Sequence, residues 1–364
     1  MKAVILVGGE ATRLRPLTCH MPKAMVPVLN KPFLEHVIRH LDSHGIADII
    51  LAQSAHSQPI HDYFKNGSEL GIKLHYSIED KPLGTAGAVK LAERYLDETF
   101  FGLNGDIFTD LDITAMLAFH QERKAKATIA LTPVDDPTSY GLIETDASGR
   151  VTRFLEKPRP EQVTTNMINA GTYILEPDVL KHIPPGTMSS FERELFPLLL
   201  ELGEPVYAYT SAAYWIDIGT PEKYLQLNMD LLNNSGIKTS RLPEGKISIG
   251  KDCSIDPAAE LSEPVLMGNN CTIGRGVRVI GPAVIGHNCT IMDDAVVEKS
   301  VVWQNTTIFE RASVTGSIIG QNCCLSEDSI VSQSVLGENV TVAGGATLEP
   351  GCKIWAGETV PGST

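Results

Sequence analysis

Residues 267–291, MGNNCTIGRGVRVIGPAVIGHNCTI, contain the same short pattern twice. Aligned on this pattern, the chain carries six copies, whose second residues are separated by 18, 18, 17, 17 and 17 positions. These second residues are Gly250, Gly268, Gly286, Trp303, Gly320 and Gly337. The residue before each of them and the residue five positions after it are apolar in every copy. Apolar positions six residues apart, in units of about 18 residues, predict a parallel β-helix with three six-residue sides per coil.

Cysteines occupy one position of the pattern in four copies, at Cys253, Cys271, Cys289 and Cys323. Such a column of thiols has two interpretations: a metal or redox site, or a small buried side chain that recurs because the position recurs. No histidine or carboxylate recurs beside the thiols. The pattern therefore favours the structural interpretation.

The first 230 residues have a different periodicity. Apolar strand-like runs at 3–7, 48–52, 99–106 and 127–132 alternate with helical patterns at 33–45, 84–96 and 112–126. In the first helical pattern, Leu34, Val37, Ile38 and Leu41 recur at the spacing of one buried face. This alternation predicts an α/β domain with a Rossmann-like, mostly parallel sheet. Such sheets bind ligands beyond the carboxyl ends of their strands.

The remaining segments complete a two-domain plan. Residues 141–158, GLIETDASGRVTRFLEKP, alternate around a D-A-S-G turn and predict a hairpin inserted in the α/β domain. Residues 233–245, NNSGIKTSRLPEG, are polar with glycine and proline, and are typical of a linker. We therefore predict an α/β domain at 1–232, a linker at 233–245 and a β-helix domain at 246–364.

Composition excludes several classes of protein. The net charge of −14 argues against a nucleic-acid partner, which selects a basic surface. No apolar stretch approaches the roughly 20 residues that span a membrane, and the short run after Lys2 is unlike a signal peptide. The seven cysteines form no C-x-x-C pair, which is typical of reduced thiols. We expect a cytoplasmic protein without a membrane partner.

The first predicted strand leads into VGGEATRLRPLT at residues 7–18. A double glycine, Gly8 and Gly9, lets the backbone approach a phosphate closely. Arg13 adds a delocalised charge suited to phosphate oxygens, and Lys23 follows as a compact second cation. A tight turn with solvated arginines is the alternative, and this motif alone does not decide between them.

Two acidic residues follow strand-like runs elsewhere in the α/β domain. Asp106 ends LNGD, so we expect it at the same sheet edge as the double glycine. Asp217 follows an aromatic-apolar run in YWIDIGTP. Carboxylates at this edge suit Mg²⁺, which shares oxygen ligands with substrate phosphates. An Asx turn and a strand end are the respective structural alternatives.

Two further groups of residues have competing interpretations. Glu156 and Lys157 are adjacent in FLEKP, so on a regular strand they point to opposite faces and share a task only across a bend. His36, His40 and His44 recur at four-residue spacing, which raises the possibility of metal ligands. They lie away from the apolar face of their helix, so we expect a solvated stripe instead.

The order of these motifs is more specific than any one of them. The N-terminal 230 residues resemble the sugar-1-phosphate nucleotidyltransferases, whose signature G-G-x-G-T-R-L-x-P-L-T…P-K is similar to GGEATRLRPLTCHMPK. PLGTAGA, LNGD, FLEKP, INAGTYIL and WIDIGTPEKY follow in the family order. With SFERELFP and the hexapeptide tail, the chain looks most like the members that guanylylate mannose 1-phosphate. The resemblance also implies that the β-helix is left-handed.

The resemblance implies a role for each matching residue. Arg13, Lys23, Asp106 and Asp217 are implied as catalytic, with Mg²⁺ held by the two aspartates. Residues implied to bind the NTP are Leu6, Gly8, Gly9, Arg13, Lys23, Gly84 and Thr85. Residues implied to bind the sugar phosphate are Gly141, Glu156, Lys157 and Asn169. The sequence departs from the signature at Ala11, where a required positive φ costs about 1 kcal/mol or more.

The implied reaction joins an NTP and a sugar 1-phosphate into an NDP-sugar with release of pyrophosphate. GTP and mannose 1-phosphate are the favoured substrates, and glucose 1-phosphate with dTTP or UTP is the alternative. A hexapeptide acyltransferase is disfavoured because the aligned coils offer only His287 as a base. A non-catalytic regulatory subunit is disfavoured because the charged groups of the family are all present. We expect a homo-oligomer formed through the β-helix.

Overall fold

The computed structural model describes residues 1–9, 11–54, 57–233, 236–237 and 246–362. Packing divides the chain into two compact units, which we call unit 1 (Met1–Gly9 and Leu34–Ile216) and unit 2 (Glu10–Phe33 and Asp217–Thr364). This division differs from the domain boundaries expected at residues 232 and 246, because residues 11–33 and 217–232 pack with the β-helix. The predicted linker lies mostly outside the described residues.

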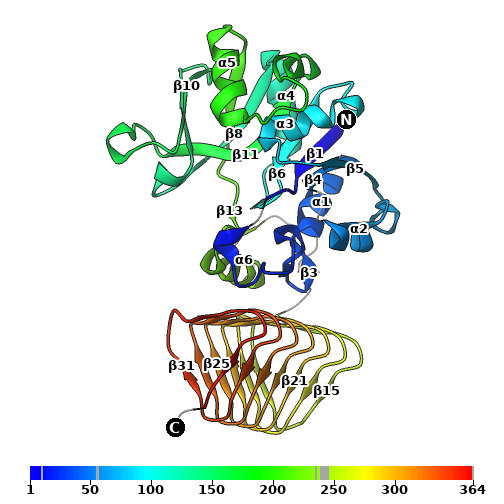
Figure 1. Ribbon diagram of the computed structural model, residues 1–364, viewed down its shortest axis with the longest axis vertical. Coiled ribbons are helices and arrows are strands. Elements are labelled where there is room, and N and C mark those ends of the chain that lie inside the picture. Colours follow the sequence, from blue (N-terminus) through cyan, green and yellow to red (C-terminus); the bar gives the residue numbers. More distant parts are fainter. Residues whose placement is uncertain (10, 55–56, 234–235, 238–245, 363–364) are drawn as a thin grey trace. The chain divides into compact units, whose positions relative to one another are not determined.

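Unit 1 is built on one nine-stranded sheet (Figure 1). Its central strands run in the order β6 (Phe100–Asn104), β1 (Lys2–Leu6), β4 (Asp48–Ser54) and β5 (Lys73–Glu79), and all four are parallel. β11 (Met167–Leu175) pairs antiparallel with β6 and with β8 (Ala127–Pro133), and β8 pairs parallel with β12 (Val206–Thr210). The predicted parallel core is confirmed, and the antiparallel strands extend it on one side.

The helices of unit 1 are α1 (Phe33–Ser43), α2 (Gln58–Phe64), α3 (Gly84–Leu91), α4 (Ile113–Arg123) and α5 (Phe196–Glu201), with a π-helical turn at Phe191–Leu195. Three of them, α1, α3 and α4, occupy the predicted positions, whereas α2 and α5 were not predicted. The predicted buried face of α1 is confirmed, since Leu34, Val37, Ile38 and Leu41 are at most 6% exposed. None of the described helices has the length and apolar composition needed to cross a membrane.

The predicted hairpin at 141–158 is also confirmed. β9 (Gly141–Thr145) and β10 (Val151–Glu156) pair antiparallel, and β9 continues the main sheet beside β11. The Asp146 carboxylate accepts hydrogen bonds from the Ser148 and Arg150 backbone N–H groups at 2.8 and 3.0 Å, which closes the turn. Glu156 is the last residue of β10 and lies opposite Gly141, the first residue of β9.

The β-helix consists of three parallel sheets in stacked coils (Figure 1). The first sheet contains β14 (Ile247–Ile249), β17 (Val265–Met267), β20 (Ala283–Ile285), β23 (Val301–Val302), β26 (Ile318–Ile319), β29 (Val335–Leu336) and β32 (Lys353–Ile354). The second contains β15 (Ser254–Ile255), β18 (Thr272–Ile273), β21 (Thr290–Ile291), β24 (Thr307–Ile308), β27 (Cys324–Leu325), β30 (Thr341–Val342) and β33 (Thr359–Val360). The third contains β16 (Glu260–Ser262), β19 (Arg278–Ile280), β22 (Val296–Glu298), β25 (Ser313–Thr315), β28 (Ile330–Ser332) and β31 (Thr347–Leu348).

Close stacking explains the glycines of the repeat. A Cβ added to Gly286 would lie 2.4 Å from the backbone nitrogen of Gln304 in the next coil, and one added to Gly320 would lie 2.6 Å from the carbonyl carbon of Gly337. Two positions later, asparagine adopts a left-handed φ of 56 to 59° at Asn270, Asn288, Asn305, Asn322 and Asn339. Asparagine tolerates this conformation better than most residues, which accounts for its recurrence.

Two 3-10 turns, one hairpin and one helix outside the coils belong to unit 2. A 3-10 turn spans Thr12–Leu14 and another spans Lys23–Met25. β2 (Pro27–Val28) and β3 (Lys31–Pro32) form a short hairpin, and α6 (Pro221–Leu232) follows Asp217. The segment with the predicted phosphate-binding cations is therefore part of the same unit as the β-helix.

Candidate active site

The double glycine lies beyond the carboxyl end of β1, as predicted. Leu6 is the last residue of that strand, Gly8 and Gly9 are exposed, and Gly9 has a φ of +106°. A Cβ added to Gly8 would lie 3.4 Å from Oε1 of Glu79, the last residue of β5. The other oxygen of that carboxylate accepts a hydrogen bond from the Leu83 backbone N–H at 3.0 Å. Glu79 thus lies at the glycine loop, although no sequence motif pointed to it.

Asp106 lies at the sheet edge where the sequence predicts it. β6 pairs with β1 so that Asn104 is opposite Leu6, and the Gly105 N–H donates to the Leu6 carbonyl at 2.9 Å. A Cβ on Gly105 would lie 2.5 Å from that carbonyl oxygen, so only glycine permits this approach. Asp106 follows directly and is half-buried. The glycine loop and Asp106 therefore follow the ends of two paired strands.

Ala11 adopts the left-handed conformation that its position suggests, with φ 47° and ψ 40°. Its carbonyl accepts hydrogen bonds from the Leu14 N–H at 3.1 Å and the Thr18 hydroxyl at 2.9 Å. These bonds hold the turn that carries the exposed Arg13. The backbone strain expected for a non-glycine residue is therefore present in this loop.

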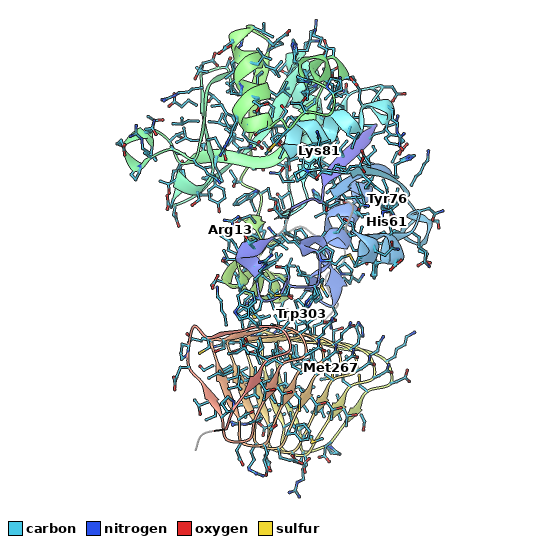
Figure 2. The ribbon with its side chains drawn as sticks, in the orientation of Figure 1. Arg13, His61, Tyr76, Lys81, Met267 and Trp303 are labelled. Atoms are coloured by element: carbon cyan, nitrogen blue, oxygen red, sulfur yellow. The ribbon has the colours of Figure 1, made fainter. Side chains whose placement is uncertain are left out.

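Arg13 and Asp217 come together around a glycine in unit 2 (Figure 2 labels Arg13). A Cβ added to Gly219 would lie 3.0 Å from Nη2 of Arg13 and 3.1 Å from Oδ2 of Asp217. The other oxygen of Asp217, which is 8% exposed, pairs with the Lys223 ammonium. Thr220 caps α6 by accepting from the Lys223 N–H at 3.4 Å, which sets Lys223 in the first turn. Sequence reasoning missed Lys223, although WIDIGTPEKY contains it.

The backbone bends between Glu156 and Lys157, as it must if both side chains are to contact the same substrate. β10 ends at Glu156, and Lys157 adopts a left-handed φ of 50° while its N–H donates to the Tyr140 carbonyl at 2.9 Å. Strand alternation therefore does not extend to Lys157. Burial raises the pKa of the Glu156 carboxyl, and the nearby Glu192 carboxylate raises it further. A Cβ on Gly141 would lie 2.9 Å from Oε2 of Glu156, so this glycine keeps space beside the carboxylate.

A polar chain links the predicted sugar and nucleoside residues of unit 1. The Asn169 side-chain amide donates to the Tyr173 hydroxyl at 2.8 Å, and that hydroxyl donates to Glu192 Oε1 at 3.1 Å. The second oxygen of Glu192 accepts from the Thr85 hydroxyl at 3.0 Å. Glu192 belongs to SFERELFP, which the sequence comparison used without assigning any residue in it a role. Glu192 lies in the middle of this series of hydrogen bonds, and it is the main residue that sequence reasoning missed.

Gly84 is held against the segment that carries Glu192. Gly84 has a φ of +71°, and a Cβ on it would lie 2.5 Å from the Ser189 carbonyl oxygen. The same carbonyl accepts hydrogen bonds from the Ala86 and Gly87 N–H groups at 3.0 and 3.2 Å. The glycines of PLGTAGA therefore permit close packing of α3 against residues 187–191.

The histidines of α1 correct one expectation, since none is fully solvated. His40 Nε2 lies 2.9 Å from the Leu111 carbonyl oxygen, and His44 Nδ1 lies 2.8 Å from the Thr114 hydroxyl. His36 contacts the Phe108 ring edge-on. Burial lowers the pKa of His40 to about 4, with a smaller contribution from His44. Through these contacts the three histidines pack on residues 108–114, the segment that leads into α4 and begins it.

His287, Thr306 and the recurring thiols of the coils have structural partners. His287 Nδ1 accepts a hydrogen bond from the Asn269 N–H at 2.9 Å. The Cys271, Cys289 and Cys323 thiols each contact a carbonyl of the next coil at 3.1 to 3.2 Å, and the Thr306 hydroxyl makes the same contact at 3.0 Å. A hydroxyl replaces the thiol there, so the position provides a hydrogen-bond donor. Burial raises the thiol pKa of Cys271 to about 11. Within the described residues, no cluster of three or more metal-ligating side chains occurs.

The predicted site residues thus fall into three groups. Leu6, Gly8, Gly9 and Asp106 lie at the carboxyl edge of the unit 1 sheet. Gly84, Thr85, Gly141, Glu156, Lys157 and Asn169 gather around Glu192 or at the end of the β9–β10 hairpin in the same unit. Arg13, Lys23 and Asp217 belong to unit 2.

Family models match both parts of the chain. A model described as nucleotidyl transferase matches residues 2–234, and one described as the LbH domain of EIF2B subunit epsilon matches residues 244–348. The second match supports the predicted left-handed β-helix, since the coils and sheets agree with it.

Sequence relatives align with most of the chain. The mannose-1-phosphate guanylyltransferase of Mycobacterium tuberculosis is 39% identical over 264 residues, covering 71% of this chain and 72% of the relative. A UTP–glucose-1-phosphate uridylyltransferase of Synechocystis is 35% identical over 323 residues, covering 84% and 83%. The structure of HddC from Yersinia pseudotuberculosis complexed with GMP-PN superposes with a TM-score of 0.54 and 34% identity, covering 62% of this chain and 97% of that chain. The chain therefore belongs to the nucleotidyl transferase family.

Proposed function

We propose that the protein transfers a nucleotidyl group from an NTP to a sugar 1-phosphate. An oxygen of the sugar phosphate attacks the α-phosphorus, the bond to the β-phosphate oxygen breaks, and pyrophosphate leaves. The favoured substrates are GTP and mannose 1-phosphate, and glucose 1-phosphate with dTTP or UTP is the alternative. The observation that carries the proposal is the convergence of Arg13 and Asp217 around Gly219, because it pairs a phosphate-binding cation with a metal-binding carboxylate.

Positive charge and open backbone would bind the triphosphate. Gly8 and Gly9 are exposed and free of side chains, so phosphate oxygens can approach the backbone. Arg13 is exposed in its turn and has a planar, permanent charge suited to the leaving pyrophosphate. Lys23 would provide the second cation near the α-phosphate. Catalysis of this kind rests on positioning and charge stabilisation.

Mg²⁺ is the cofactor that we propose, held by Asp106 and Asp217. Asp106 follows β6 in unit 1, and Asp217, the last residue of β13 (Trp215–Asp217), belongs to unit 2. Gly219 leaves the space beside Asp217 Oδ2 that a Cβ would fill, so the residues present suit a small cation with oxygen ligands. When bound, the ion would supply positive charge to the reacting phosphates. Lys223 holds the other oxygen of Asp217 and so orients this carboxylate.

The sugar would bind where carboxyl and amide groups gather. Glu156 and Glu192 offer acceptors for sugar hydroxyls, and Asn169 is held by the Tyr173 hydroxyl. Gly141 keeps the approach to Glu156 open. Lys157 is exposed beside the bend and would bind the sugar phosphate.

Glu79 supports guanine as the base. Guanine presents N1–H and N2–H donors side by side, and a carboxylate accepts both. Uracil and thymine present one N–H donor between two carbonyl oxygens. These oxygens are acceptors, so they are repelled by a carboxylate. Glu79 Oε1 lies near Gly8 while Oε2 is held by the Leu83 N–H, so one oxygen has a fixed direction at the glycine loop.

Pyrophosphate release tests the reaction and the substrates together. GTP, dTTP, UTP and ATP are each combined with mannose 1-phosphate and with glucose 1-phosphate in the presence of Mg²⁺. We expect the highest kcat/KM for GTP with mannose 1-phosphate. Preference for dTTP or UTP with glucose 1-phosphate would favour the alternative substrates, and absence of turnover with every pair would contradict the enzyme.

We further propose a cytoplasmic homo-oligomer that associates through the β-helix. The first strand of the coils, β14, has a free edge among the described residues, and its Ile247 and Ile249 are 36% and 45% exposed. An open strand edge with exposed apolar side chains favours pairing with another chain. The seven cysteines are free thiols, which agrees with a reducing compartment. A monomeric mass in light scattering would contradict the oligomer.

A further inference from the structure

The segment that carries Lys23 ends in a hairpin whose tip is strained. Leu29 and Asn30 join β2 to β3 with left-handed φ angles of 48 and 62°. Asparagine tolerates this conformation, but leucine does so at a cost. The Leu29 N–H donates to the buried Asn228 side chain of α6 at 3.0 Å, and the Asn30 amide donates to the Ile285 carbonyl of a coil at 2.8 Å. Contacts with α6 and the coils therefore hold the tip in place.

Trp303 holds the beginning of the same hairpin. It occupies the position where the other five aligned copies of the repeat have glycine, and it is 3% exposed (Figure 2). Its indole N–H donates to the Tyr224 hydroxyl at 2.9 Å, and the two rings meet edge-on at 6.2 Å. The buried Tyr224 hydroxyl donates in turn to the Pro27 carbonyl, the first residue of β2. Trp303 is therefore linked to Pro27, four positions after Lys23, through the Tyr224 hydroxyl.

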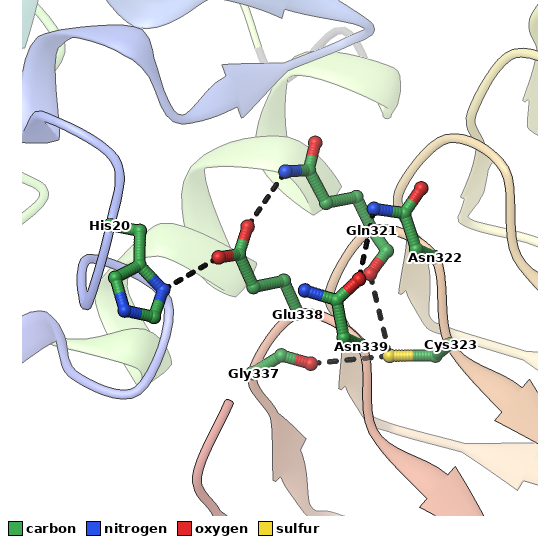
Figure 3. Close-up of polar contacts among 7 residues, drawn as sticks. All are labelled: His20, Gln321, Asn322, Cys323, Gly337, Glu338 and Asn339. Atoms are coloured by element: carbon green, nitrogen blue, oxygen red, sulfur yellow. Dashed lines mark hydrogen bonds and ion pairs between the residues drawn. The ribbon is translucent and has the colours of Figure 1, made fainter. Parts of the chain in front are cut away.

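Glu338 holds the segment on the other side of Lys23. His20 Nδ1 lies 2.6 Å from Glu338 Oε1, and the second carboxylate oxygen accepts from the Gln321 amide at 2.7 Å (Figure 3). Gln321 accepts in turn from Gln304 of the preceding coil at 3.3 Å. The coils therefore orient the Glu338 carboxylate toward His20. Lys23 lies between two points, His20 and Pro27, that the coils hold directly or through α6.

We propose that Trp303 and Glu338 are positioning residues for Lys23. By holding His20 and Pro27 they restrict the 3-10 turn Lys23–Met25, which lies between those residues. A lysine that is already oriented loses less conformational entropy when it binds an anion. The coils then contribute to triphosphate affinity without contacting the substrate. The identity of the ligand rests on the proposed function, whereas the restriction of the turn does not.

Two conservative variants test this inference in the full chain. Trp303→Phe keeps an aromatic ring and removes the N–H donor, and Trp355→Phe is its matched control, because Trp355 occupies the same repeat position in the last coil and is 48% exposed. Calorimetry measures binding of inorganic tripolyphosphate with Mg²⁺, and hydrogen exchange measures the Val26, Leu29 and Phe33 amides. We expect Trp303→Phe to bind about three- to tenfold more weakly and to exchange these amides faster. Trp355→Phe keeps the affinity and the exchange of the wild type.

Kinetics separate positioning from general loss of structure. At an unchanged thermal midpoint, Trp303→Phe is expected to raise KM for the NTP while KM for the sugar phosphate stays constant. Glu338→Gln provides a second variant if Trp303→Phe fails to fold, and Glu327→Gln, an exposed β-helix acid paired with Arg311, is its control. The inference is overturned if a folded variant and its control bind tripolyphosphate with equal affinity. It is also overturned if the wild type does not bind tripolyphosphate. Absence of turnover overturns only the proposed function, because the binding and exchange measurements need no reaction.

Discussion

Contacts in the β-helix recur from coil to coil, whereas each contact around the proposed sugar and nucleoside residues of unit 1 occurs once. A thiol or hydroxyl donates to the next coil's carbonyl at Cys271, Cys289, Thr306 and Cys323 in the same way. In unit 1, Glu192 links Thr85 with the Tyr173 hydroxyl. A repeated contact stabilises its own coil, and its loss is a local event. At the proposed site, a contact made once would determine where a substrate group lies, so we expect its loss to change the chemistry more than the stability.

The largest expected loss of turnover comes from a unit 1 residue without a repeated counterpart, Asp106. Asp106→Ala removes a proposed Mg²⁺ ligand from the sheet edge, so we expect turnover to fall by on the order of 10³-fold. The half-buried Asp106 follows the end of β6, so the thermal midpoint is expected to change little. Pyrophosphate release and a melting curve measure the two quantities. Turnover at the wild-type rate would remove Asp106 from the site.

Asp106 also shows how far the sequence alone reaches into unit 1. Its place beside the glycine loop follows from two paired parallel strands, which hydrophobic periodicity predicts well. The bend at Lys157 was expected as a requirement, and the structure contains it. Lys223 was missed although its partner Asp217 lies in the same motif, six positions away. Glu79 and Glu192 were missed because the groups that they meet are remote: Glu79 lies beside Gly8, and Glu192 meets Thr85 across 107 positions. Such pairing leaves no local pattern.

The β-helix is more predictable because its contacts have a fixed sequence spacing. The six aligned copies are all present as coils, and the structure adds a seventh at β32 and β33. That coil escaped the alignment because Trp355 replaces the glycine and the asparagine is absent. Trp303 aligned in spite of the same replacement, but its contact with Tyr224 had no sequence signal. Of the two departures from glycine, Trp303 is buried and contacts α6, whereas Trp355 is 48% exposed.

Glu79→Gln tests a second contact made once. The glutamine oxygen keeps an acceptor for the Leu83 N–H, while the amide group replaces the oxygen near Gly8. An amide donor opposes the guanine N1–H and N2–H groups, so kcat/KM for GTP is expected to fall about 10- to 100-fold relative to UTP. Asp80→Asn, an exposed neighbour, is the control and should leave the ratio unchanged. An unaltered GTP to UTP ratio in Glu79→Gln would exclude this residue from base selection.

Gly286→Ala tests a repeated contact. The added Cβ would lie 2.4 Å from the Gln304 backbone nitrogen, so the two coils must separate locally. We expect the free energy of unfolding to fall by about 1–3 kcal/mol, with kcat of the folded protein retained. Gly344→Ala is the matched control, since its Cβ would meet its nearest atom at 3.3 Å. A loss of kcat larger than the loss of folded protein would show that single coils do affect the chemistry.

The histidines of α1 predict a pH dependence in unit 1. Burial lowers the pKa of His40 from its ordinary value of 6.5 to about 4, so the folded state holds this ring neutral. Protonation then favours the unfolded chain, and stability is lost as the pH falls from about 6.5 toward 4. His44 opposes protonation, while Asp110, Asp112 and the Leu111 carbonyl favour it.

Comparison with His40→Gln isolates this contribution, because glutamine can still donate to the Leu111 carbonyl without titrating. We expect the wild type to lose about 1–2 kcal/mol more stability than His40→Gln between pH 7 and pH 5. Denaturant titrations at the two pH values measure the difference. His120, which is 2% exposed and also has a lowered pKa, titrates in both proteins and cancels. Equal losses in the two proteins would mean that His40 is protonated in the folded state without penalty.

Ala11→Gly is expected to have the smallest effect, and it is the one replacement expected to raise the free energy of unfolding. At φ 47°, the alanine Cβ crowds its own backbone, and glycine relieves about 1 kcal/mol of this strain or slightly more. Glycine also gives the unfolded chain more freedom, which offsets part of the gain, so we expect a net stabilisation of about 0.5 kcal/mol. Ala115→Gly in α4 is the control, where the same replacement destabilises by about 1 kcal/mol because the backbone is helical. A destabilised Ala11→Gly would mean that the hydrogen bonds to the Ala11 carbonyl already make the left-handed loop favourable for alanine. The alanine would then stiffen the turn that carries Arg13, and tripolyphosphate would bind the variant more weakly than the wild type.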